Sequence, residues 1–162
     1  LLAPHPAATR EHPCRAQETV VSISTHDGGV PVRRQRDRDS LARSPDRAGH
    51  WENISPKAHD YGISVAEDNN GVIYVGAARG RPYGWIRQEG ALSAILRSSD
   101  KGATWETVVD QLKGGVMHLC PTPDGNGMVA GTSDGTLLVV DDSGAREVVS
   151  GLPFVTSVEL GA

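Results

Sequence analysis

The sequence has few aromatic residues, few cysteines and no long apolar run. Aromatic residues make up 4% of the 162 residues, and the two cysteines, Cys14 and Cys120, lie far apart in the chain. Distant cysteines in different kinds of segment favour a buried thiol at Cys120 over a disulfide. No apolar run approaches the roughly 18 residues that a membrane-spanning helix needs. We therefore expect no membrane span.

The sequence also lacks an excess of either charge. Its formal net charge is −4 and its pI is about 5.8, which gives no reason to expect nucleic acid or an anionic membrane as a partner. The six histidines show no metal-ligand spacing, and no Gly-rich phosphate loop, nucleophile elbow or Cys-x-x-Cys is present. We therefore assign no metal, no cofactor and no catalytic residue.

What the sequence does contain is abundant glycine and one distinctive turn between two strand-like segments. The turn reads S-x-D-x-G-x-T-W and consists of Ser98, Asp100, Gly102, Thr104 and Trp105 with their neighbours. Ser98 and Asp100 can accept hydrogen bonds from loop N–H groups, and Gly102 allows a positive φ. Trp105 can fold back over the loop and bury its ring. The pattern predicts a hairpin rather than a site that performs chemistry.

Weaker copies of this turn occur on both sides of it. Upstream, Ser44, Asp46 and Trp51 keep the register of the motif at an offset of 54 residues, with Ala48 in place of the glycine. Downstream, Asp142 is followed by a glycine at the motif spacing, at an offset of 42 residues. Periods of about 40–50 residues are typical of propeller blades with four strands each.

These turns resemble the Asp-box, the hairpin signature of bacterial-neuraminidase-type repeats in the sialidase superfamily. The resemblance covers about residues 19–162 and implies an all-β fold of β-propeller blades, each a four-stranded antiparallel meander. About three blades plus a closing strand are expected, and residues 1–18 are expected to have little fixed structure. The predicted blades and closing strand are 19–57, 58–112, 113–152 and 153–162.

The resemblance is less informative about activity. Sialidases bind a substrate carboxylate with three arginines and use a Tyr–Glu pair and an Asp, but their Arg-Ile-Pro signature is absent here. No catalytic residue can be transferred to this chain. We therefore interpret it as a non-catalytic Asp-box segment that binds a ligand or a protein. One alternative is part of a sialidase-like or other glycosidase whose catalytic residues lie mostly on other blades, and another is an assembly or receptor scaffold.

The expected partners follow from the number of blades. Because rings use roughly four to eight blades, the partner is the remainder of the ring, in a longer protein, or further copies of this chain. The start at Leu1 indicates a truncated chain, so the cellular location stays open. A glycan or a protein is the expected ligand.

A candidate site follows from meander topology. The long insertion 77–92 joins the second and third strands of its blade, so it should lie at the opposite end from the Asp-box turns, together with the inter-blade loops. Arginines suit carboxylates or phosphates, and aromatic faces suit sugars. The alternative is a solvated loop, with His59 and Asp60 stabilising a turn rather than acting as an acid/base pair. The candidate binding residues are His59, Asp60, Arg79, Arg81, Tyr83, Trp85 and Arg87.

Overall fold

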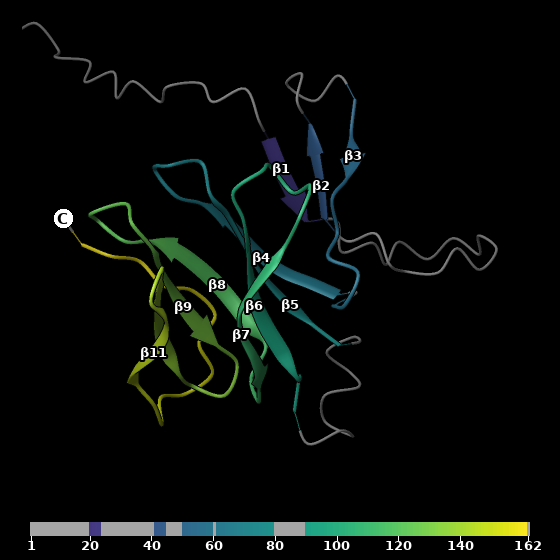
Figure 1. The fold of residues 1–162 in the computed structure, drawn as a ribbon. Helices are drawn as coiled ribbons and strands as arrows, with labels where there is room; N and C mark the ends of the chain where they lie inside the picture. The colour runs from purple at the N-terminus through teal and green to yellow at the C-terminus, as the bar shows by residue number, and fades with distance from the viewer. Residues whose placement is uncertain (1–19, 24–40, 45–49, 60, 80–89, 162) are drawn as a thin grey trace, which may run out of the picture.

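The computed structural model describes residues 20–23, 41–44, 50–59, 61–79 and 90–161. Within these ranges the chain is all-β, as the sequence predicted: antiparallel strands form three sheets that follow one another along the chain (Figure 1). The predicted unstructured segment 1–18 lies outside the described residues. No helix in the described ranges is long and apolar enough to cross a membrane.

Each sheet pairs strands that are consecutive in the sequence. The first sheet has three strands, β1 (Val20–Ile23), β2 (Leu41–Ser44) and β3 (Glu52–Asn53). The second has four, β4 (Tyr61–Glu67), β5 (Ile73–Ala78), β6 (Ser93–Ser98) and β7 (Glu106–Leu112). The third has four, β8 (Val116–Pro121), β9 (Met128–Thr132), β10 (Leu137–Asp141) and β11 (Gly144–Val149). The prediction of four-stranded antiparallel meanders is confirmed for the second and third sheets.

The second sheet, β4–β7, is the centre of the molecule because apolar residues cover both of its faces. Side chains alternate along β5 and β6, so neighbouring residues enter different clusters. Tyr74 and Ile95 belong to a cluster shared with the third sheet, which includes Val116, Leu119, Met128, Ala130, Leu138 and Val140. Val75 and Leu96 belong to a cluster shared with the first sheet, which includes Leu41, Ile54, Ala77 and Ala94.

The second and third sheets approach each other closely at one glycine. A Cβ atom on Gly76 would lie 2.6 Å from the Cβ of Val116 and 2.6 Å from Ser64 Oγ, so only glycine fits there without a shift. Ser64 Oγ also donates a hydrogen bond of 2.8 Å to the Val116 carbonyl. Strand β8 is thereby held against β4 and β5.

The predicted closing strand at 153–162 is wrong over the residues that are described. Residues 150–161 form no strand but cross β8 and β9, where Val155 and Val158 lie against Gly131. The Val155 N–H donates to the Thr132 carbonyl at 3.4 Å, and the Val158 N–H donates to His118 Nδ1 at 3.2 Å. An alternating pattern becomes a strand only beside an open strand edge, and this segment lies over a sheet face instead.

Candidate functional site

The turn after β6 is held by its own side chains, as the motif predicted. Asp100 Oδ1 accepts the Thr104 N–H at 2.8 Å and Asp100 Oδ2 accepts the Thr104 hydroxyl at 2.6 Å. Ser98 Oγ donates to Asp100 at 2.7 Å and accepts the Gly102 N–H, and Gly102 has a φ of +88°. The hydrogen bonds from Thr104, and then that from Ser98, lower the pKa of Asp100 to about 2.

Trp105 follows this turn and joins it to the preceding sheet. Its indole N–H donates to the Ile54 carbonyl at 2.7 Å, and its half-buried ring packs against the cluster that contains Ile54 and Leu41. The upstream counterpart behaves differently: Ser44 is buried, but Trp51 is 46% exposed. Asp46 lies outside the described residues. The tryptophan at this position of the motif is thus packed on the preceding sheet at Trp105 and largely exposed at Trp51.

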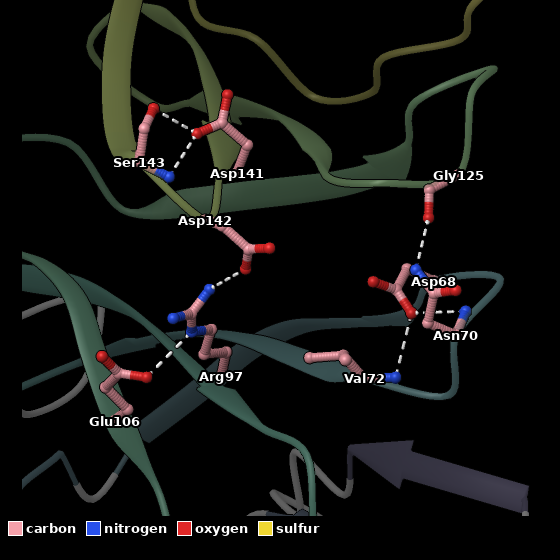
Figure 2. Close-up of polar contacts among 9 residues, drawn as sticks. All are labelled: Asp68, Asn70, Val72, Arg97, Glu106, Gly125, Asp141, Asp142 and Ser143. Carbon is pink, nitrogen blue, oxygen red and sulfur yellow. Dashed lines mark hydrogen bonds and ion pairs between the residues drawn. The ribbon is translucent and has the colours of Figure 1, made fainter.

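An arginine beside each of these two turns connects neighbouring sheets. Arg97 Nε contacts Glu106 in the adjacent strand at 2.9 Å, and Arg97 Nη1 contacts Asp142 in the third sheet's last turn at 2.5 Å (Figure 2). Arg43 repeats the arrangement one sheet earlier. It pairs with Glu52 at 2.5 Å and donates to the Lys101 carbonyl in the second sheet's turn at 2.8 Å. Arg43 and Glu52 stand 54 residues before Arg97 and Glu106, at the offset of the two turns. This spacing does not reveal that each arginine reaches the next sheet.

A pocket of about 410 Å³ opens beside Arg97, between the turns of the second and third sheets. Asp68 begins the turn after β4 and accepts the Asn70 and Val72 N–H groups at 2.8 and 2.9 Å (Figure 2). Asn70 in turn reaches the Gly125 carbonyl of the third sheet at 3.4 Å. The side chains that define the pocket come from both sheets and include Asp68, Tyr74, Arg97, Trp105, Glu106 and Asp142.

The pocket has more acidic than basic groups. Three carboxylates, on Asp68, Glu106 and Asp142, line it with one guanidinium, that of Arg97. Burial raises the pKa of the Tyr74 hydroxyl, and the charge of Asp68 raises it further. No histidine or cysteine is among the described residues that line the pocket. The sequence analysis did not find this site, because its residues lie on four separate turns and three strands.

Two of the predicted binding residues come together at the opposite end of the second sheet. His59 Nε2 lies 3.3 Å from Asp110 Oδ1, and Arg79 Nη2 lies 3.7 Å from Asp110 Oδ2. His59 is only 2% exposed, and its Nδ1 has no hydrogen-bond partner among the described residues. Burial acts to raise the pKa of Asp110, but hydrogen bonds from the Gln111 N–H and from His59 outweigh burial and lower it.

Asp110 was missed by the sequence analysis, because one aspartate near the end of a strand carries no distinguishing signal. The remaining predicted binding residues lie outside the described residues: Asp60, Arg81, Tyr83, Trp85 and Arg87. Across the described ranges, no three His, Cys, Asp or Glu side chains gather into a potential metal site. The described part of this end is therefore a contact between buried His59 and half-buried Asp110, with exposed Arg79 beside it.

Comparison with known proteins gives little further information. No family model matches the chain, and no curated protein matches it. The chain is similar to the crystal structure of a protein of unknown function from Dyadobacter fermentans DSM 18053, with 20% sequence identity and a TM-score of 0.43. The match covers 67% of this chain and 32% of that one, so the chain spans about a third of the solved structure.

Proposed function

We propose that this chain is a segment of an Asp-box β-propeller that binds a ligand or a protein partner and catalyses no reaction. The observation that carries this proposal is the pocket beside Arg97, which is already formed and is held by contacts between two sheets. Preformed concave sites with a few oriented polar groups are the usual form of ligand sites. The pocket shares the concave form and the oriented polar groups of such sites, while most of its lining is polar.

The propeller assignment is supported by three features, two of which are repeated. Two complete four-stranded meanders pack face to face, the turn after β6 has the hydrogen bonding that an Asp-box motif predicts, and the arginine contact between sheets occurs twice. Propellers are built from such sheets arranged around an axis. In this proposal the partner blades belong to the rest of a longer protein or to further copies of the chain.

A glycosidase is the second candidate, since the pocket holds more than one carboxylate and glycosidases use a pair of them. Glu106 and Asp142 are the most exposed carboxylates of the pocket, with 67% and 94% of their side chains exposed. Both contact Arg97, however, so the guanidinium occupies the space between them. In a glycosidase, the scissile bond of the substrate lies between the two carboxylates. Because Arg97 occupies this position, the arrangement favours binding over catalysis.

The test is a panel of immobilised ligands assayed with the purified chain for binding and for turnover. The panel contains a neutral oligosaccharide, a sialylated oligosaccharide, a basic peptide and an acidic peptide. We expect binding to at least one ligand and release of no sugar or peptide product. Released sugar, abolished by Glu106→Gln, would contradict the proposal in favour of a glycosidase. Absence of binding to every ligand would also contradict it.

The panel also distinguishes the two ends of the second sheet. Arg79→Gln alters the end predicted from the sequence, and Asp142→Asn alters the pocket end. Arg79 is 52% exposed at its side chain, so its replacement should leave the fold intact. If Arg79→Gln alone weakens binding, the site lies at the end that carries the insertion; if Asp142→Asn alone weakens it, the site is the pocket.

A further inference from the structure

We propose that Asn126 is a site of spontaneous modification, at which the side-chain amide is lost and aspartate or isoaspartate forms. The sequence contains two Asn-Gly pairs, Asn70-Gly71 in the turn after β4 and Asn126-Gly127 in the turn after β8. These turns join the first two strands of the second and third sheets. The folded structure protects Asn70 and leaves Asn126 reactive.

The reaction needs only the chain and water. The backbone nitrogen of Gly127 attacks Cγ of Asn126, the new N–C bond closes a succinimide ring, and the Cγ–Nδ2 bond breaks. The Gly127 N–H proton leaves with the Asn126 amide group as ammonia. Water then opens the ring at either carbonyl and gives aspartate or isoaspartate. A following glycine favours ring closure, because it has no Cβ that would hinder the approach.

At Asn70 the attacking nitrogen is held in its own turn. The Gly71 N–H donates to the Asp68 carbonyl at 3.1 Å, and the Asp68 N–H donates to the Val72 carbonyl at 3.0 Å. The buried Asp68 side chain also accepts the Asn70 and Val72 N–H groups (Figure 2). Ring closure at Asn70 would break the Gly71 hydrogen bond and disturb the others.

At Asn126 the attacking nitrogen is not held. The Gly127 carbonyl accepts the Thr122 N–H at 2.9 Å, but the Gly127 N–H donates no hydrogen bond to a described residue. Gly127 is buried, and a buried donor without an acceptor costs free energy. The succinimide nitrogen carries no hydrogen. Ring closure here therefore removes an unsatisfied donor and breaks no hydrogen bond of that nitrogen.

Two Asp-Gly pairs that could close the same ring resemble the protected Asn-Gly pair. The N–H of Gly125 donates to the Thr122 carbonyl at 2.8 Å, and the N–H of Gly135 donates to the Thr132 carbonyl at 3.1 Å. Among the Asn-Gly and Asp-Gly pairs of the described ranges, only the pair at Asn126 has an attacking nitrogen outside a hydrogen bond.

The side chain of Asn126 can turn towards this nitrogen. Asn126 is exposed, and its Nδ2 lies 3.5 Å from Asp124 Oδ2. This distance exceeds the usual range of about 2.7–3.2 Å for an N–H···O bond, so little energy is lost when the side chain moves.

The product changes the region where the second and third sheets meet. Asn126 lines the pocket beside Arg97, so its conversion adds a carboxylate to a lining that already contains Asp68 and Asp142. Isoaspartate also adds a carbon atom to the main chain next to Gly125, which lies too close to Asn69 to admit a Cβ. We expect isoaspartate to weaken this contact between the two turns.

The experiment is a time course of the full chain at neutral and mildly alkaline pH, with and without urea. Peptide mapping by mass spectrometry follows the mass difference between an NH2 and an OH group, and isoaspartyl methyltransferase labels isoaspartate. In the folded chain Asn126 should be converted about two- to tenfold faster than Asn70, the factor that one hydrogen bond contributes. In urea the two rates should become similar. Both rates should rise with pH, because the attacking nitrogen loses its proton.

Two variants serve as matched controls. Asn126→Gln should stop the conversion at this position, because glutamine would have to close a larger ring. Asn70→Gln should leave the conversion of Asn126 unchanged, and thermal melts check that both variants fold. Conversion of Asn70 as fast as that of Asn126 in the folded chain would overturn the proposal. So would a folded chain whose Asn126 stays intact while the chain in urea is converted.

Discussion

The inner and outer strands of the second and third sheets differ strongly in burial. All six residues of β5 in the second sheet are buried, whereas five of the six residues of β11 in the third are exposed. The difference comes from position within a sheet, because β5 is an inner strand while β11 is the outer strand of its sheet. The inner strand β9 of the third sheet is likewise buried at all five residues. Inner and outer strands of the same meander are therefore expected to contribute very differently to stability.

The two sheets also close their last hairpin in different ways. In the second sheet an extended turn is organised around Asp100, which accepts three hydrogen bonds. In the third sheet a tight turn uses Asp141, which accepts the N–H and the hydroxyl of Ser143 at 2.7 and 2.5 Å. In both sheets, an aspartate in the turn accepts hydrogen bonds from residues further along the chain. They differ in how many bonds it accepts.

The largest effect is expected from removing a buried side chain of the second sheet. Ile95→Ala should destabilise the chain by about 2–5 kcal/mol, since Ile95 is fully buried and its loss leaves a cavity. Val148→Ala in β11 is the control and should change stability by less than about 0.5 kcal/mol, because Val148 is 51% exposed. Urea denaturation measures both. Equal effects would show that the two sheets are not buried as described.

A smaller effect is expected at the contact between the sheets. Gly76→Ala should destabilise by about 1–3 kcal/mol, because the added methyl group would overlap Val116. Gly161→Ala is the matched control, with no atom within 4 Å of the added group. The measurement is again urea denaturation. Wild-type stability of Gly76→Ala would mean that the second and third sheets do not pack closely in solution.

The smallest effect is expected in the turns and appears in acid. The pKa of Asp100 is about 2 in the folded chain and 3.8 in the unfolded chain. The ionised Asp100 carboxylate therefore stabilises the fold, and this contribution is fully present above about pH 4. This contribution is lost as the pH falls from about 4 through 2. In Asp100→Asn the melting temperature should therefore decrease less between pH 4 and pH 2 than in the wild type. This change should be larger than the one caused by Asp141→Asn. Melting temperatures between pH 2 and 7 measure the effect, and identical slopes would contradict it.

Much of the fold could be predicted because its signals are local. The residue types at 98–105 marked the hairpin, and the repeated turns marked the blade boundaries of the second and third sheets. The prediction of a closing strand at 153–162 was wrong because a strand forms only beside the open edge of another strand. The alternation of apolar residues does not reveal whether such an edge is near. Local pattern also gave no sign of Asp110, which matters only because the fold brings it to His59 and Arg79.

By itself the sequence determined the all-β class and the chemistry of the turn around Asp100. Each of these depends on residues close together in the chain, where spacing alone sets which groups can meet. Only the tertiary structure decided that Arg97 reaches Asp142, that Trp105 is covered while Trp51 is not, and that a pocket forms between two sheets. Those features depend on how the sheets pack against one another. Packing brings together residues that are far apart in the sequence, and sequence separation does not predict which of them meet.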